Sequence, residues 1–160
     1  MVNLQIFAVG KIRESYFEAG IAEYVKRLGK YVKLEIVAVE DEPIPTEANV
    51  AQKAAVLACE GERILAKLPK DAFVITLEIE GKSIDSVGLS QLIEKVSTYE
   101  TGKLSFVIGG SLGLADIVKA RSNFALSLSS LTFPHQLVRL MLLEQLYRAF
   151  SILNHSNYHK

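Results

Sequence analysis

The chain has 160 residues, of which 49% are hydrophobic and 22% are charged, a composition typical of a soluble globular domain. Its 18 basic and 18 acidic residues cancel, and this zero net charge disfavours binding of nucleic acid by bulk electrostatics alone. The one cysteine, Cys59, excludes an intrachain disulfide framework and fits a reducing compartment, so we expect a cytoplasmic protein without a signal peptide.

The first half of the chain predicts two strands, each followed by a helix. In chain order these are a strand at residues 4–9, a helix from residue 15, a strand at residues 34–39 and a helix over about 47–67. Ser15 and Glu18 have the spacing of a capping box at the start of the first helix. In the second helix Gly61 is a weak point, and Cys59 lies in an apolar run that predicts a buried structural thiol.

The second half continues the alternation. It predicts strands at residues 73–79, 104–108 and 124–128, and helices at residues 89–99, 114–120 and about 134–153. The strand at 73–79 is apolar nearly throughout, which indicates burial on both faces. No linker or repeat interrupts the pattern. The sequence therefore predicts one α/β domain over residues 1–160, with a mostly parallel sheet and helices on both faces.

Three small polar loops follow strands of the second half, at residues 80–83, 109–113 and 129–132. Ligands of open α/β sheets bind outside the carboxyl ends of the strands, and glycines let the backbone approach a ligand. One such loop is best interpreted as a tight turn, but three in succession predict a ligand cleft. The dinucleotide fingerprint and the phosphate loop are both missing. The cleft therefore suits an adenosine-type ligand without phosphates.

The last helix is apolar almost all round, and such a helix must be buried. One side can cover the sheet while the other needs a partner, so we expect a homodimer through this helix; the alternative is a fully intramolecular core. Arg139, Glu144 and Arg148 interrupt the helix and disfavour a membrane span, and the last two have the spacing of an ion pair. His155 and His159 are four apart but have no Cys or carboxylate nearby, so no metal site is expected.

Two segments, VIGGSLGL at 107–114 and LSLSSLTFPHQLVRLMLLEQLYRAFSILNHSNYHK at 126–160, carry a resemblance to a known family. The chain resembles the bacterial ribosomal RNA large subunit methyltransferase H family, which are small knotted SPOUT methyltransferases. The resemblance covers the whole chain and includes AVGK at 8–11 and TLEIEGK at 76–82.

This resemblance implies a C-terminal trefoil knot, a rare exception to the rule that chains do not thread their own loops. It implies that S-adenosyl-L-methionine binds in the knot. Carried over position by position, the contacts fall on Leu77, Gly109, Leu128, Ser129, Ser130, Leu131, Thr132 and Phe133. The implied substrate is a pseudouridine of 23S ribosomal RNA, methylated at N3 on assembled ribosomes by a homodimer.

N3 of pseudouridine carries a proton, so a group must remove it or stabilise the anion. The candidates are Tyr158, His159, Arg148 and His135. Arg148 suits developing negative charge on a base oxygen, and His159 can accept a proton near neutral pH. We rank Tyr158 and His159 first as contacts to the RNA, while the identity of the base stays open, water included.

RNA contact has a second candidate in the locally basic N-terminal region. Its cations are Lys11, Arg13, Lys26, Arg27, Lys30 and Lys33, and a solvated helix face is an equally good interpretation. Two other functions remain open at this point: a SPOUT methyltransferase acting on transfer RNA, and a ribosome-associated binding factor without catalysis.

Overall fold

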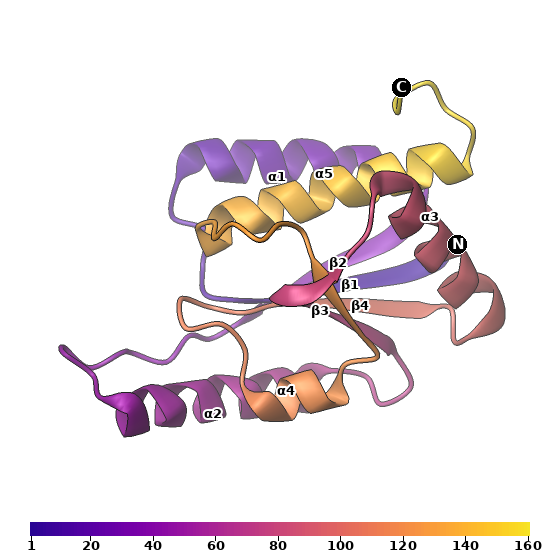
Figure 1. Ribbon diagram of the computed structural model, residues 1–160. Coiled ribbons are helices and arrows are strands. Elements are labelled where there is room, and N and C mark those ends of the chain that lie inside the picture. The colour runs from indigo at the N-terminus through magenta and orange to yellow at the C-terminus, as the bar shows by residue number, and fades with distance from the viewer.

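Five strands alternate with five helices in the computed structural model, which describes residues 1–160. In order they are β1 (Val2–Val9), α1 (Ser15–Leu28), β2 (Val32–Val39), α2 (Val50–Lys67), β3 (Phe73–Ser83), α3 (Ser86–Tyr99), β4 (Lys103–Ile108), α4 (Asp116–Arg121), β5 (Phe124–Ser127) and α5 (His135–Leu153) (Figure 1). Every strand and helix expected from the sequence is present, so the predicted alternation is confirmed.

The five strands form one parallel sheet in the order β2-β1-β4-β3-β5. Because all strands are parallel, their carboxyl ends lie at one edge of the sheet. The chain passes from β1 outwards to β2 on one side, and from β4 outwards past β3 to β5 on the other. The winding therefore reverses between β1 and β4, and open α/β sheets bind ligands at such a switch point.

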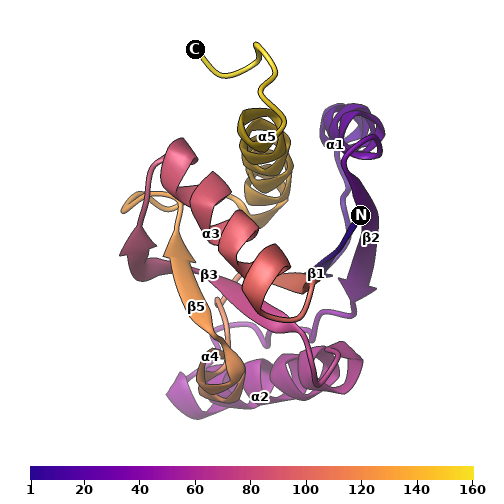
Figure 2. The same ribbon diagram turned by 90° about the vertical axis from the view of Figure 1, so that its right-hand side faces the viewer.

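Helices cover both faces of the sheet, as the sequence predicted. Leu4, Ile6 and Ala8 of β1 point into the core shared with α1, α3 and α5, whereas Phe7 and Val9 point into the core shared with α2 and α4. Figure 1 and Figure 2 show these two helical layers on opposite sides of the strands. The molecule is thus a three-layer α/β/α sandwich. The trefoil knot stays a prediction of the resemblance.

The helix starts differ from the sequence prediction. Glu14 precedes α1 in an extended conformation and makes no side-chain cap, so the predicted capping box at Ser15 is wrong and Ser15 is the first helical residue. The capping box lies at α2 instead. There Asn49 Oδ1 accepts from the Gln52 amide at 2.8 Å, and the Gln52 side chain accepts from the Asn49 amide at 2.9 Å. This cap starts α2 at Val50, later than expected.

Helix α2 also corrects two expectations about single residues. Cys59 is exposed, so the predicted buried thiol is wrong. The buried stripe of α2 contains Val56, Glu60 and Ile64, and Cys59 lies outside it. Gly61 does not weaken the helix visibly: a Cβ there would lie 2.9 Å from the Cβ of Ala115, so glycine lets α2 approach the start of α4. None of the five helices combines the length and the hydropathy that crossing a bilayer requires.

Candidate active site

A cavity of about 570 Å³ opens where β3, β4 and β5 end. This volume is in the range of small-molecule sites, about 300–1,000 Å³. Its walls come from the end of β3, the glycine loop after β4, the segment after β5 and the start of α5. Seven of the eight residues expected to hold the cofactor line it, namely Leu77, Gly109, Leu128, Ser129, Leu131, Thr132 and Phe133. Ser130 is the exception and does not belong to the lining.

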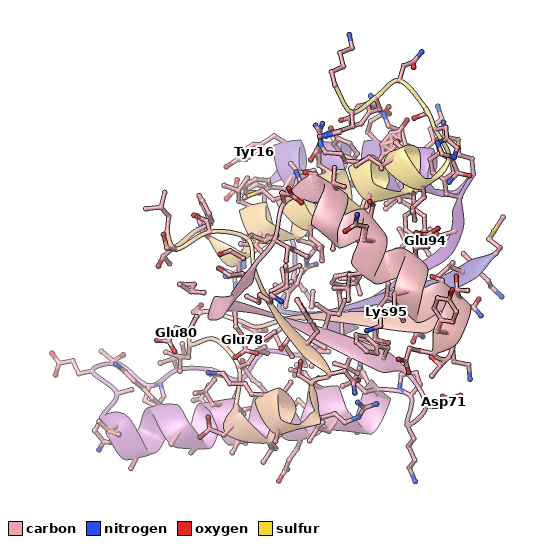
Figure 3. The ribbon with its side chains drawn as sticks, turned by 45° about the vertical axis from the view of Figure 1, so that its right-hand side comes forward. Tyr16, Asp71, Glu78, Glu80, Glu94 and Lys95 are labelled. Carbon is pink, nitrogen blue, oxygen red and sulfur yellow. The ribbon has the colours of Figure 1, made fainter.

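The β3 wall is built by a bulge. Leu77 and Lys82 both pair with Leu126 of β5, so residues 78–81 are extra on the β3 side. The predicted loop at 80–83 is therefore wrong: these residues belong to the bulged end of β3, and Leu77, Glu78 and Ile79 reach the cavity in their place. Figure 3 shows Glu78 and Glu80 at this end of the strand.

The loop after β4 folds back on itself at its glycines. Gly110 and Gly113 form an antiparallel bridge, and the Gly113 amide donates to the Gly110 carbonyl at 3.1 Å. A Cβ at Gly109 would lie 2.4 Å from the carbonyl oxygen of Gly113, and Gly113 itself has φ +85°. Neither position accepts a side chain without strain. The loop therefore presents backbone to the cavity.

The segment after β5 is tied to β3 by serines. Ser127 Oγ donates to the Ile79 carbonyl at 2.8 Å, and the Leu131 amide donates to Ser129 Oγ at 3.0 Å. The first bond joins β5 to the β3 bulge, and the second holds the turn that follows β5. Leu131, which lies on the cavity lining, is nevertheless 67% exposed. A large apolar side chain in that position is suited to contact with a ligand rather than with the core.

The charge of the cavity excludes one ligand class. Glu78 supplies the one carboxylate of the lining, and no Lys or Arg lies on it. A phosphate group would find no cation there, whereas hydroxyl groups of a ribose would find an acceptor. Burial lowers the pKa of His135, and the nearby Arg139 guanidinium lowers it further. The His135 imidazole at the rim is therefore neutral at pH 7 and able to accept a proton.

A second cluster lies at the other end of α5. Tyr158 Oη donates to Glu144 Oε1 at 3.1 Å, and Arg148 Nη1 lies 3.3 Å from His159 Nδ1. The predicted ion pair between Glu144 and Arg148 is confirmed. Hydrogen bonding to Tyr24, burial and the bond to Glu144 raise the pKa of Tyr158. Tyr158 therefore stays a phenol at neutral pH and donates its hydrogen bond to Glu144.

The two clusters do not meet within one subunit. His135 and Arg148 are about 20 Å apart along α5 at the helical rise of about 1.5 Å per residue. Figure 1 shows the chain end at the far end of α5 from the cavity side. Of the four predicted catalytic residues, only His135 lines the cavity. The other three, Arg148, Tyr158 and His159, form the tail cluster.

Comparison with known proteins now decides the family. The family model described as "Predicted SPOUT methyltransferase" matches residues 2–159. The chain belongs to the SPOUT methyltransferase family. Relatives named ribosomal RNA large subunit methyltransferase H align over 159 residues, 99% of this chain and 100% of theirs. They are 51% identical in Listeria monocytogenes, 50% in Bacillus pumilus and 47% in Carboxydothermus hydrogenoformans. The resemblance seen in the sequence is thus confirmed.

Solved structures share this SPOUT fold. A probable methylase family protein from Haemophilus influenzae aligns with a TM-score of 0.53 at 18% identity, covering 98% of this chain and 70% of that one. A probable methyltransferase from Bordetella pertussis aligns with a TM-score of 0.55 at 15% identity, covering 92% and 93%. At these identities the likeness concerns the fold alone.

The cavity of this SPOUT chain has the volume of a small-molecule site and a lining unsuited to a phosphate group. At Gly109 the backbone of Gly113 fills the space that a Cβ would take, so the loop folds tightly on itself, and the lining lacks the cations that a phosphate needs. His155 and His159 follow the end of α5, so their spacing of four does not place them on one helix face. No cluster of three or more His, Cys, Asp or Glu side chains is placed to hold a metal ion.

Sequence reasoning missed one buried polar residue near this site, Glu60. Its signal was present: Glu60 lies four residues from both Val56 and Ile64, at the spacing of the buried stripe of α2. A charged residue at an apolar position of a helix needs an explanation. We interpreted residues 47–67 as an ordinary long helix and gave Glu60 no role.

Proposed function

We propose that this chain is an S-adenosyl-L-methionine-dependent methyltransferase that methylates N3 of a pseudouridine in 23S ribosomal RNA of assembled ribosomes. The proposal includes a single catalytic domain over residues 1–160, acting in the cytoplasm. The observation that carries it is the cavity at the ends of β3, β4 and β5, with its backbone-lined glycine loop. The relatives named as methyltransferases of the large ribosomal subunit RNA support the choice of substrate.

The cofactor-binding residues divide by their chemistry. Leu77, Leu128 and Leu131 supply apolar walls for the adenine ring, and Gly109 allows backbone contact. Glu78 already accepts from Thr76 Oγ1 at 2.6 Å and lies 4.0 Å from Lys119 Nζ, and its carboxylate has further lone pairs that could accept from a ribose hydroxyl. Bound S-adenosylmethionine would supply the methyl group from its sulfonium. The residues around it need only hold and orient it, because positioning supplies much of the rate of such a displacement.

The separation of the two clusters supports a homodimer. A groove of about 600 Å³ runs beside α5, between the cavity and the tail cluster, and half-buried Leu137, Leu140 and Met141 line it. A second copy of α5, laid antiparallel in this groove, would bring the tail of one subunit to the cavity of the other. We therefore propose that Tyr158 of the partner subunit and His159 of the partner subunit complete each site.

The chemistry assigns a role to each group in such a composite site. The bond from N3 to the methyl carbon forms as the bond from sulfur to that carbon breaks, and the N3 proton must pass to an acceptor. Neutral His135 lies closest to the cavity and can accept it, with His159 as the second candidate. Arg148 keeps its charge, because the bond to Glu144 raises its pKa, and can stabilise a negative base oxygen.

The basic region of α1 lies next to the tail cluster, which supports RNA contact there. Tyr24 Oη lies 3.4 Å from Tyr158 Oη, and the Arg27 guanidinium lies 5.2 Å from the Tyr24 ring. The Lys30 ammonium lies 4.8 Å from the ring of Tyr31. Cations beside aromatic rings suit phosphates and unstacked bases. Arg27 also pairs with Glu23, so this face offers modest affinity for free RNA.

The test is methyl transfer by the purified protein in vitro. Intact ribosomes, free 23S ribosomal RNA and transfer RNA, all from a strain lacking the gene, are incubated with labelled S-adenosylmethionine. We expect label in the 23S RNA of ribosomes and little in the other two. Label in transfer RNA alone would favour the transfer RNA methyltransferase. Absence of both label and calorimetric binding of S-adenosylmethionine would favour the non-catalytic binding factor.

A further inference from the structure

A second, smaller cavity lies beside the first, and the proposed function gives it no role. Its volume is about 150 Å³, and it shares Gly110, Ser111 and His135 with the larger cavity. Val9 and Gly10, at the end of β1, also line it. It therefore lies at the switch point between β1 and β4, where the sheet reverses its winding.

The wall of this cavity contains a buried carboxylate. Glu60 is only 5% exposed, and its Oε2 accepts one hydrogen bond, from the Glu42 amide at 3.0 Å. Its Oε1 has no hydrogen-bond partner, and a Cβ on Gly110 would lie 3.5 Å from that oxygen. The free oxygen thus lies against the glycine loop. Burial raises the pKa of Glu60, because removing a carboxylate from water disfavours its charged form.

No side chain forms an ion pair with Glu60, although the charge of Arg63 acts on it from a distance. Arg63, the nearest cation on α2, forms its ion pair with Glu42 instead. Asp41 also lines the cavity and makes no ion pair, so it adds negative charge. On the α5 side, Arg139 donates to the Gly10 carbonyl at 3.2 Å and its Nε has no partner. The cavity is therefore acidic on one side, with a buried cation behind the other.

We propose that this second cavity holds the amino-acid end of S-adenosylmethionine, with Glu60 accepting hydrogen bonds from the α-ammonium group. The inference rests on the proposed function and adds a recognition residue to it. The first cavity suits the adenosine part, and the shared residues make the second its continuation. The cavity volume of about 150 Å³ is well above the roughly 10–15 Å³ that one water needs, so it has room for a short chain with an amine and a carboxylate.

Calorimetric titration with two probes tests this assignment. S-adenosylmethionine carries the amino-acid end, and methylthioadenosine lacks it. Glu60→Gln is expected to weaken binding of S-adenosylmethionine at least tenfold and to leave binding of methylthioadenosine unchanged. The matched control is Glu62→Gln, since Glu62 lies on the same helix, is exposed and does not line either cavity. This control is expected to bind both probes as the unaltered protein does.

The outcomes separate this inference from the proposed function. Unchanged affinity of Glu60→Gln for S-adenosylmethionine would overturn the inference alone. An equal loss of affinity for both probes would also overturn it, because Glu60 would then act only by supporting the glycine loop. Failure of the unaltered protein to bind either probe would overturn the proposed function. If Glu60→Gln does not fold, Asp41→Asn serves in its place. We expect it to lose affinity for S-adenosylmethionine selectively, but by less than Glu60→Gln. Unchanged affinity of Asp41→Asn for S-adenosylmethionine would contradict the inference.

Discussion

Gly109 shows how one residue type sets the shape of the site. A Cβ at this position would lie 2.4 Å from the Gly113 carbonyl oxygen, so a side chain would have to push the loop apart. We expect Gly109→Ala to lose most affinity for S-adenosylmethionine and to lower the free energy of unfolding by about 1–3 kcal/mol. Calorimetry and urea unfolding measure the two effects.

Gly29→Ala is the matched control, because Gly29 has helical φ and ψ at the end of α1 and its Cβ would meet nothing closer than 3.4 Å. It is expected to stay within about 1 kcal/mol of the unaltered protein. Unchanged ligand affinity in Gly109→Ala would contradict the role of the loop.

Glu60 carries a pH-dependent cost in the absence of ligand. Since its pKa is raised in the folded state, the folded protein prefers the protonated form, and this contribution to stability is lost as pH rises through the raised pKa. We expect Glu60→Gln to melt a few degrees higher than the unaltered protein at pH 7, with the difference vanishing below about pH 4, near the ordinary carboxyl pKa.

Thermal unfolding at the two pH values measures this difference, and Glu62→Gln should show none. A lower melting temperature for Glu60→Gln at pH 7 would show that the carboxylate stabilises the fold, contrary to the desolvation argument.

Some residues that line the cavities could be predicted from the sequence and others could not, for a physical reason. Gly109 and the run 128–133 were predictable, because they follow strands and match the family segment by segment. The burial of Glu60 could be predicted from its place in the apolar stripe of α2. Its contact with the glycine loop could not, because that contact arises only when α2 packs on the sheet. For the neighbouring Cys59 the sequence predicted a buried thiol, but the residue is exposed.

At the scale of elements, α5 links two sites with different tasks. Its start lines the cofactor cavity, and its end holds the tail cluster. Removing residues 158–160 deletes Tyr158 and His159 but leaves every residue of the cavity in place. We expect this truncation to abolish methylation while leaving the affinity for S-adenosylmethionine nearly unchanged. Methylation of ribosomes and calorimetry measure the two, and full activity of the truncated chain would contradict the role of the tail.

Element boundaries were harder to predict than element identity. We expected residues 80–83 to form a polar loop that binds the ligand, but they belong to β3 and Gly81 lies in its bulge. A Cβ at Gly81 would lie 2.7 Å from the Ala125 carbonyl oxygen, so this glycine lets the bulge pack on β5. The bulge depends on pairing with a strand some 45 residues later in the chain, and a single segment carries no sign of it.

In the whole molecule, the proposed site is complete only when two subunits pair. Leu137 is half-buried and lines the groove beside α5, so a charge there should oppose association. We expect Leu137→Glu to be monomeric in light scattering at micromolar concentration and to lose methylation. Its affinity for S-adenosylmethionine should fall far less, since Leu137 does not line that cavity.

The control is Val50→Glu, an exposed apolar residue at the start of α2 in the opposite layer, where an acidic side chain suits the helix dipole. This variant should stay dimeric. A Leu137→Glu protein that methylates normally as a monomer would contradict a site shared between subunits.

The most direct test of the central claim is mass spectrometry of ribosomal and transfer RNA from a strain that lacks the gene. We expect one pseudouridine of 23S ribosomal RNA to lose its N3 methyl group in this strain. The methyl group should return on complementation with the intact gene, but not with the gene truncated at residue 157. Transfer RNA should be unaltered. An unchanged 23S methylation pattern, or a methyl group lost from transfer RNA instead, would contradict the claim.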